Sequence, residues 1–251
     1  MQAEEPDAQP LPEDPPPEAG EEEEPLDFAD LPLPTVADLR AALDWAFQGE
    51  EAPAEFLERC AAHAHYVQVA NRRMNLTAIV EPREIAAKHY LDSWRTTRLL
   101  PLLGRSVLDV GSGAGYPGMP LALAEPQARV VMIDSVKKKA DFIAESIQAL
   151  GVTNAFAEGG RAEEHLVRHR YDLVVFRAVS SVRENVRLLR KVRHSFRDLI
   201  MMKGPSWSRE VRAAERETER LGFRLDTVWE HKLPGELGDR AVLVYRAPGG
   251  R

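Results

Sequence analysis

Four glycines fall within eight positions of the stretch VLDVGSGAGYPGMPLALA, residues 107–124. They lie between a short apolar run and an Ala/Leu-rich run, and they are Gly111, Gly113, Gly115 and Gly118. Glycine fills a strand or a helix poorly, so this density is typical of a turn whose backbone must be approached closely. A strand, a glycine-rich turn and a helix in this order predict a ligand-binding turn of an α/β protein.

Beyond Gly104, apolar runs alternate with amphipathic segments. This alternation predicts right-handed βαβ units and a parallel sheet that is covered on both faces. The last two strands are joined by LPGELGD, which is too short for a crossover helix, so we expect them to pair antiparallel at one edge. The predicted strands are 106–111, 128–134, 154–159, 171–178, 198–204, 223–232 and 241–247, and the predicted helices are 117–124, 135–150 with Ser135 as N-cap, 161–167, 182–193 and 206–221.

Upstream of the sheet the hydrophobic spacing is helical. Apolar residues recur at helical intervals over 36–47 and 53–73, and a further helix is expected from Pro82 to just before Pro101. We therefore predict an N-terminal helical cap over residues 35–103 and a ligand-binding domain over residues 104–251.

Residues 1–34 differ from the rest of the chain in composition. They hold twelve carboxylates, no Lys or Arg, and nine of the eighteen prolines. Such a segment has too little apolar surface to offset the entropy of ordering, which predicts a disordered acidic tail. Without these twelve carboxylates, 28 acidic residues remain against 33 basic ones, so residues 35–251 carry a net charge of +5. A mildly basic body is compatible with a polyanionic partner.

The cysteine count and the hydropathy pattern indicate the cellular compartment in which the protein is expected. The single cysteine, Cys60, excludes an intramolecular disulfide and a thiolate zinc cluster, which favours a reducing cytoplasm. The tail lacks the features of a signal or transit peptide, and no run of about 18 uncharged apolar residues could cross a bilayer. His63 and His65 have no further ligands at metal spacing, so we interpret them as helix-surface residues and expect no metal.

The glycine turn fits two cofactor classes. Gly113, Gly115 and Gly118 match G-x-G-x-x-G, the dinucleotide fingerprint of an NAD-dependent oxidoreductase. Counted from Asp109, the stretch is D-x-G-x-G-x-G, the turn of S-adenosylmethionine-dependent methyltransferases. A carboxylate just before the turn can face the cationic amino group of that donor, whereas it would gain little from a pyrophosphate. Asp134, at the end of the second strand, suits ribose hydroxyls in both classes.

Eight stretches, the glycine-rich one included, narrow the choice between these two cofactor classes. They are NRRMNLTAI (71–79), KHYLDSW (88–94), the glycine-rich stretch itself, DSVKKKADFI (134–143), GRAEE (160–164), FRAVSS (176–181), MKG (202–204) and HKLPGELGDR (231–240). With these the chain resembles the GidB (RsmG) family of bacterial methyltransferases, which methylate N7 of a guanosine in small-subunit ribosomal RNA. The resemblance covers about residues 55–245. It implies a class I methyltransferase (Rossmann-like) fold, S-adenosyl-L-methionine as cofactor, and 16S ribosomal RNA or the 30S subunit as partner.

The resemblance also implies site residues. Together with the turn it gives the cofactor-binding set Asp109, Gly111, Gly113, Tyr116, Asp134, Ala162, Glu163 and Arg177. Tyr116 stands where the family usually has Phe or Leu, and Phe176 stands where it usually has Ser. Arg177 ends the fourth strand beside the expected entry of the methyl acceptor, and Lys203 ends the fifth strand on the ligand side. We therefore expect Arg177 and Lys203 to be the catalytic residues.

Guanine N7 carries a lone pair and no proton, so attack on a sulfonium methyl needs no general base. Catalysis is then expected from proximity, alignment and electrostatics. His89 is accordingly interpreted as a packing or RNA-contact residue, whereas Asn75 and Asp92 either line the acceptor entrance or cap the N-terminal helices. A ribosome-associated binding protein without turnover stays open as an alternative. Candidate phosphate contacts are Arg72, Arg73, Lys88, Lys137, Lys138, Lys139 and Lys203.

Overall fold

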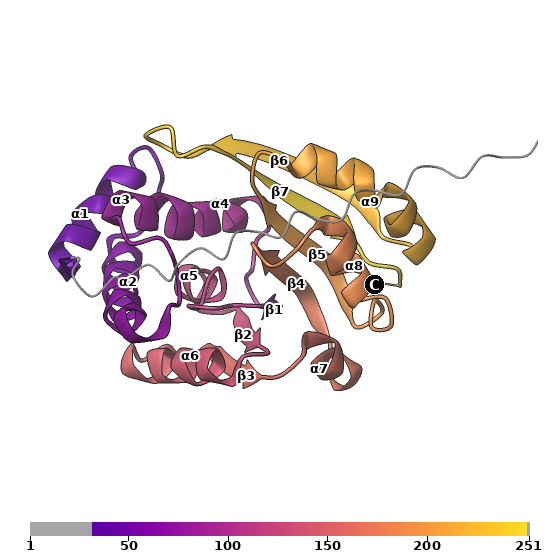
Figure 1. The fold of residues 1–251 in the computed structure, drawn as a ribbon, viewed down its shortest axis with the longest axis horizontal. Coiled ribbons are helices and arrows are strands. Elements are labelled where there is room, and N and C mark those ends of the chain that lie inside the picture. Colours follow the sequence, from indigo (N-terminus) through magenta and orange to yellow (C-terminus); the bar gives the residue numbers. More distant parts are fainter. Residues whose placement is uncertain (1–31, 250–251) are drawn as a thin grey trace, which may run out of the picture.

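A seven-stranded sheet crosses the centre of the molecule, with helices on both faces (Figure 1). The structure is a computed structural model that describes residues 32–249, so most of the predicted acidic tail, residues 1–31, lies outside the described residues. The strand order is β3-β2-β1-β4-β5-β7-β6, and β7 runs antiparallel to both of its neighbours. The strands are β1 (Ser106–Val110), β2 (Arg129–Asp134), β3 (Ala155–Gly159), β4 (Tyr171–Arg177), β5 (Phe196–Lys203), β6 (Arg224–Lys232) and β7 (Asp239–Arg246).

This arrangement confirms the predicted doubly wound sheet with an antiparallel last strand. Because side chains alternate along a strand, successive residues enter different cores. Val107 of β1 enters the core shared with the cap, while its neighbour Leu108 enters the core on the other face. Apart from the helices of the cap, the helices are α5 (Gly118–Ala124), α6 (Lys137–Ala149), α7 (Ala162–Arg168), α8 (Val182–Leu188) and α9 (Trp207–Leu221).

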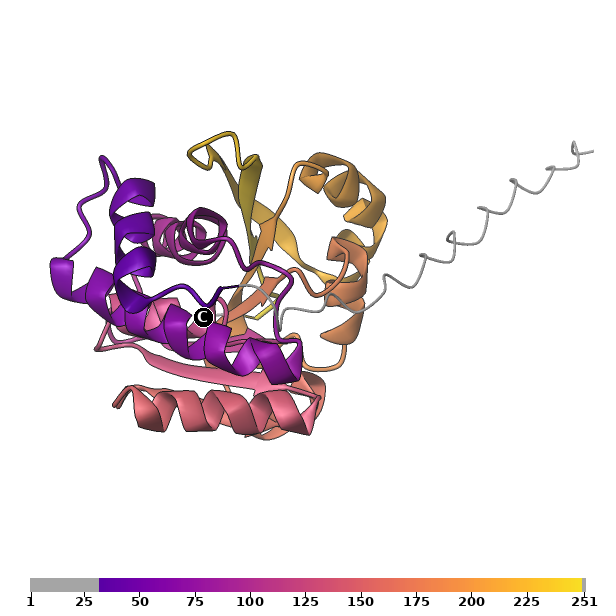
Figure 2. The ribbon, with the colours of Figure 1, turned by 60° about the vertical axis from the view of Figure 1, so that its left-hand side comes forward.

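The N-terminal helices pack on the same face of the sheet as α5 and α6 (Figures 1 and 2). They contribute to one continuous hydrophobic core with β1, β2 and β4, so the cap is not packed as a separate unit. The helix expected from Pro82 onward is present, but its middle turn is a π-helix. The cap helices are α1 (Val36–Ala46), α2 (Ala54–Met74), α3 (Pro82–Glu84), the π-helix η1 (Ile85–Leu91) and α4 (Asp92–Leu99).

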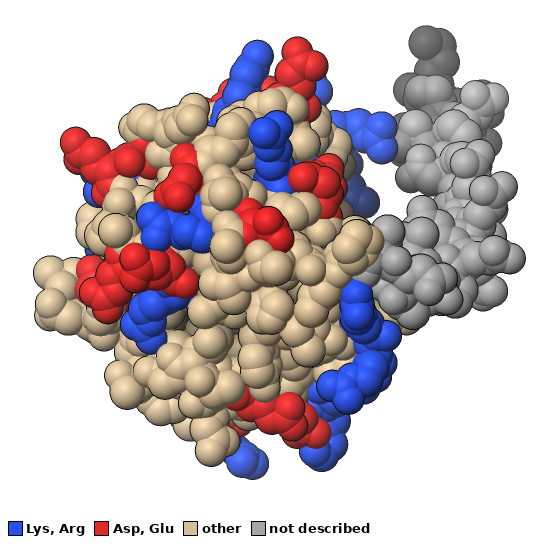
Figure 3. Space-filling model, turned by 90° about the vertical axis from the view of Figure 1, so that its left-hand side faces the viewer, with Lys and Arg blue, Asp and Glu red and all other residues tan. Residues whose placement is uncertain are grey.

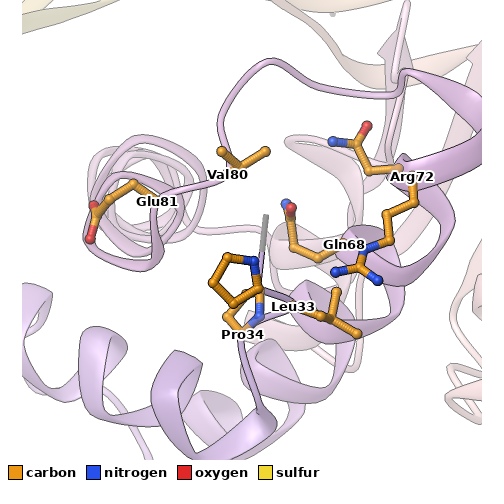
Figure 4. Close-up of a pocket in the computed structure, with 8 residues that line it drawn as sticks. Leu33, Pro34, Gln68, Arg72, Val80 and Glu81 are labelled. Carbon is orange, nitrogen blue, oxygen red and sulfur yellow. The ribbon is translucent and has the colours of Figure 1, made fainter. Parts of the chain in front are cut away.

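The last residues of the predicted tail, 32–34, pack against the cap. The backbone carbonyl of Pro34 accepts a hydrogen bond from Nδ1 of His65, with the two atoms 3.0 Å apart. Beside this contact, a cavity of about 240 Å³ lies between residues 32–34 and α2 (Figure 4). Cap residues such as Gln68 and the residues before the cap line this cavity, and no strand contributes to it.

Two helix boundaries differ from those predicted. Ser135 is not the N-cap of α6, because the carboxylate of Asp134 accepts the backbone N–H of Val136 at 2.9 Å and α6 begins at Lys137. The helix predicted over 182–193 ends at Leu188, and the chain then turns into β5. None of the helices within residues 32–249 combines the length and the apolar character needed to cross a bilayer.

Candidate functional site

The glycine turn is fastened to the ends of two neighbouring strands. The N–H of Gly111 donates to the carbonyl of Ile133 at 2.8 Å, and the N–H of Gly113 donates to Oδ2 of Asp134 at 3.0 Å. The other oxygen of Asp134 holds the start of α6 through Val136. The Asp134 carboxylate therefore fixes the turn after β1 against the turn after β2.

Asp109, the acid before the turn, is completely buried. Its Oδ2 accepts the N–H of Gly118 at 2.8 Å, while its Oδ1 has no hydrogen-bond partner among the described residues. Burial raises the pKa of this carboxyl to about 7. A Cβ at position 118 would lie 2.7 Å from Oδ2 and 2.3 Å from Cγ of Met132, so only glycine fits where α5 passes over Asp109.

Tyr116 lies at the end of the turn in a buried aromatic cluster. Its ring stacks on the ring of His89 with centroids 4.1 Å apart, and its hydroxyl is 2.9 Å from that of Tyr90. Tyr90 is in turn 2.8 Å from Nδ1 of His63. His63 is fully buried here, so the interpretation of this residue as a helix-surface residue was wrong. The face of the helix that carries His63 packs against the glycine turn. A Cβ at position 115 would lie 3.4 Å from Nε2 of His63, which is van der Waals contact.

Arg177 extends from the end of β4 toward the cap. Its guanidinium donates to the backbone carbonyl of Lys88 at 2.8 Å and lies 2.8 Å from Nδ1 of His89. Its Nε is 3.9 Å from a carboxylate oxygen of Asp92, and the guanidinium carbon is 5.9 Å from the ring centre of Tyr116. Burial and the Arg177 charge hold the pKa of His89 well below its usual value, so His89 is a neutral packing residue.

Asp92 joins the cap to the last two strands. Its Oδ1 accepts a hydrogen bond from Nε2 of His231 on β6 at 3.0 Å, and its Oδ2 lies 4.0 Å from Nε of Arg240 on β7. His231 and Arg240 were not among the predicted site residues. The signal that could have found them is the stretch HKLPGELGDR, which contains both residues.

A cavity of about 440 Å³ opens beside Arg177 at the carboxyl ends of β4 and β5. Both predicted catalytic residues line it. Nζ of Lys203 is hydrogen-bonded to the carbonyl of Ser180 and forms an ion pair of 2.8 Å with Glu210, so Lys203 is 8% exposed. The cavity is lined by Ile79, Lys88, Asp92, Arg177, Ala178, Met202, Lys203, Gly204, Pro205, Glu210 and Arg240.

The remaining predicted site residues lie on the other side of the turn. Ala162 and Glu163 begin α7, where Ala162 is buried and Glu163 is half-buried. The end of β3 that precedes them is joined to β2, because the N–H of Gly160 donates to the carbonyl of Asp134 at 3.0 Å. The predicted site residues therefore lie around the carboxyl ends of β1 to β5. The glycine turn lies between the start of α7 on one side and the cavity beside Arg177 on the other. Within residues 32–249, no three His, Cys, Asp or Glu side chains are grouped as a metal site.

Comparison with known proteins identifies the family. The family model described as rRNA small subunit methyltransferase G matches residues 57–236. The chain belongs to this family. A protein of Solibacter usitatus named ribosomal RNA small subunit methyltransferase G is 36% identical over 74% of this chain and 88% of its own length. A protein of the same name from Symbiobacterium thermophilum is 36% identical over 79% of this chain and 85% of its own length.

Solved structures agree with the fold. An O-methyltransferase from Bacillus cereus, solved in complex with S-adenosylhomocysteine, matches with a TM-score of 0.56 over 85% of this chain and all of the other. Its sequence identity is 14%, so the likeness concerns the fold alone. As a member of the methyltransferase G family, the chain is an enzyme that uses S-adenosyl-L-methionine. This settles the choice between the two cofactor classes against the dinucleotide fingerprint, and it supports an enzyme over a binding protein without turnover.

The raised pKa of Asp109 predicts an unusual pH dependence of stability. The folded protein holds this proton up to about pH 7, whereas the unfolded chain releases it near pH 3.8. Burial of the ionised carboxyl therefore costs stability as the pH rises from 4 to 7, by roughly 1.4 kcal/mol per pH unit. We expect Asp109→Asn to gain stability relative to the wild type over this range, measured by urea unfolding without cofactor.

Asp172→Asn serves as the control, because the pKa of Asp172 is shifted in the opposite direction. Hydrogen bonds from Ser106 hold this pKa below its usual value, so the stability that Asp172 contributes changes only below about pH 4, and the Asp172→Asn and wild-type curves should run parallel between pH 4 and 7. If the free energy of unfolding of Asp109→Asn ran parallel to that of the wild type between pH 4 and 7, the raised pKa of Asp109 would be contradicted.

Proposed function

We propose that the enzyme methylates N7 of a guanosine in 16S ribosomal RNA, with the RNA or the 30S subunit as its partner in the cytoplasm. The observation that carries the proposal is the cavity lined by cationic side chains, one of which, Arg177, also lies 5.9 Å from the ring centre of Tyr116 at the end of the glycine turn. The relatives that match over most of their length are named as methyltransferases of small-subunit ribosomal RNA.

The residues around the turn fit the methyl donor. Gly113 has open space where a Cβ would stand, so a ligand can lie directly on its backbone. The unpartnered, fully buried Oδ1 of Asp109 is an acceptor that the donor's ammonium group can satisfy. Gly111 and Tyr116 would also contact the donor. Arg177 would lie between the donor and the cavity. When bound, S-adenosyl-L-methionine supplies an electrophilic methyl group.

The adjacent strand ends would hold the nucleoside part of the donor. Both oxygens of Asp134 already accept backbone N–H groups, yet each keeps a lone pair for a ribose hydroxyl. Ala162 and Glu163, at the start of α7, follow the strand next to Asp134 and would contact the adenine edge. In this arrangement the methyl-bearing end of the donor points from the turn toward β4.

The remaining chemistry is alignment. N7 of guanine has no proton to remove, so the enzyme needs no general base, and His89 is neutral and packed in any case. Arg177 keeps its guanidinium beside the cavity, where it would orient the acceptor and stabilise its polar edge. Lys203, held by Glu210 and the carbonyl of Ser180, would contribute a second fixed cation at the carboxyl end of the neighbouring strand β5.

Exposed cations offer contacts for the RNA backbone. Figure 3 shows that acidic and basic side chains alternate on the outer face of the cap, while Lys and Arg side chains follow its right-hand edge. Arg73 at the end of α2 and Lys138 at the start of α6 are exposed neighbours, since Nζ of Lys138 lies 3.5 Å from the carbonyl of Arg73. We propose phosphate contacts there, together with Arg72, Lys88, Lys137 and Lys139.

The proposed donor contact with the backbone of Gly113 can be tested with a matched pair of variants. Gly113 and Gly151 both have a positive φ, +57° and +60°, and both have open space at the Cβ position. We therefore expect Gly113→Ala and Gly151→Ala to lose similar stability, roughly 1–2 kcal/mol. Only Gly113→Ala should weaken the binding of S-adenosylhomocysteine in calorimetry, by about tenfold or more (1.4 kcal/mol or more). Equal affinities of the two variants would contradict a donor site on this turn.

The proposed reaction predicts the position of the methyl group. Small subunits that lack the modification, incubated with the enzyme and labelled S-adenosyl-L-methionine, should take up label in 16S RNA. Mass spectrometry of the digested RNA should place the new methyl group on N7 of one guanosine. Label at another atom, in another base or only in large-subunit RNA would contradict the proposal, and Gly113→Ala provides the low-activity control.

A further inference from the structure

One carboxylate in the acceptor cavity has an oxygen without a hydrogen bond. Asp92 begins α4, directly after the π-helix, and its residue is 3% exposed although it lines the cavity. Its Oδ1 is held by His231 at 3.0 Å. Its Oδ2 has only two ion-pair contacts, 3.9 Å to Nε of Arg177 and 4.0 Å to Nε of Arg240, and both exceed hydrogen-bond distance.

Asp92 is largely buried as a residue and lines the cavity, and a carboxylate in such a place is stabilised when its oxygens accept hydrogen bonds. The neighbouring cations compensate the charge of Asp92, but they do not donate to Oδ2. Because Asp92 lines the cavity, a ligand there can supply a donor to Oδ2. The cavity offers about 440 Å³, which is within the range of small-molecule sites, and the side chains of Ile79 and Met202 give it an apolar part.

The other charged groups of the cavity explain why Asp92 is suited to select a base. Arg177, Arg240, Lys88 and Lys203 only donate, so they would contact acceptors such as a base oxygen or a phosphate. In Glu210, the other carboxylate, Oε2 accepts from Lys203 at 2.8 Å and from the N–H of Val182 at 3.1 Å, and Oε1 accepts from the hydroxyl of Ser206 at 3.4 Å. Among the described residues that line the cavity, Asp92 is thus the carboxylate with an oxygen that accepts no hydrogen bond from the protein.

We propose that Asp92 is the specificity-determining residue that selects guanine, with Oδ2 accepting a hydrogen bond from the exocyclic amino group. This inference rests on the proposed function, because it assumes that the acceptor base is guanine. Guanine presents the amino group and the adjacent N1–H on one edge and N7 on the opposite side of the ring system. A base held by Asp92 through that edge therefore directs N7 away from the carboxylate.

The same contact disfavours adenine, which has no amino group at this position and presents a ring nitrogen lone pair beside it. Two acceptors that face each other in a buried site cannot be satisfied, and such mismatches give large discrimination. His231 acts as a positioning residue in this account, because its hydrogen bond to Oδ1 holds the carboxylate in the cavity, whereas the two arginines can still donate to a base oxygen or a phosphate.

Inosine tests the proposal, because it differs from guanosine only by the missing amino group and keeps N7, O6 and N1–H. Small subunits are reconstituted from 16S RNA in which inosine replaces the guanosine that the enzyme methylates. We expect kcat/KM of the wild type for inosine to be at least about tenfold lower than for guanosine, as for loss of a hydrogen bond to a charged group. Equal rates on the two substrates would overturn the proposal, whether or not any variant folds.

Asp92→Asn supplies the second measurement. The variant should be slower on guanosine, and its ratio of kcat/KM for guanosine over inosine should fall to within about threefold of one. A ratio that stays at the wild-type value, with both rates reduced equally, would mean that Asp92 only positions Arg177 and would overturn the proposal. Asp44→Asn, an exposed carboxyl paired with Arg40 on α1, is the control and should keep the wild-type ratio.

Two further readouts separate the possible failures. Calorimetry with S-adenosylhomocysteine should give Asp92→Asn the wild-type affinity, which shows that the variant is folded and that its donor site is intact. Mass spectrometry of the product shows whether the methyl group is on guanine N7. A different product would refute the proposed function, whereas the expected product with equal guanosine and inosine rates would refute the role of Asp92 alone.

Discussion

The partly buried guanidinium of Arg177 is the constraint around which the site is organised. A charge at the end of a central strand costs several kcal/mol to bury unless it is paired and hydrogen-bonded. Its compensating groups come from the cap, namely the carbonyl of Lys88, the ring of His89 and the carboxylate of Asp92. The cap therefore stabilises the carboxyl end of the sheet in two ways: it compensates the charge of Arg177, and it shares a hydrophobic core with the strands.

The topology places the proposed donor and acceptor sites side by side. The chain passes from β1 outward to β2 and β3 and then returns to β4 on the other side of β1. Ligands of doubly wound sheets bind at the carboxyl ends of the strands where the order reverses. In this enzyme the glycine turn lies on one side of that point, and the cavity with Arg177, Lys203 and Asp92 lies on the other. With the donor and the acceptor at these proposed sites, the methyl group would pass from the end of one strand to the end of the next.

Local features of the sequence could be predicted well, and contacts between distant segments could not. The strands and the turn follow from apolar runs and glycines, which act within a few residues. The hydrogen bond between Asp92 and His231 joins residues 139 positions apart, and nothing in either neighbourhood specifies it. His63 was misplaced for the same reason, since burial against Tyr90 and the turn is a tertiary property. Ser135 lost its expected capping role to Asp134, whose carboxylate reaches the N–H of Val136.

A crystal structure with bound S-adenosylhomocysteine tests the central claim most directly, namely that the donor lies over the turn between β1 and α5 and faces the Arg177 cavity. The account predicts the amino group of the ligand at Asp109, the ribose at Asp134 and the sulfur on the side of β4. A ligand bound elsewhere, for example in the cavity of about 560 Å³ beside α7, with the turn uncontacted, would contradict it.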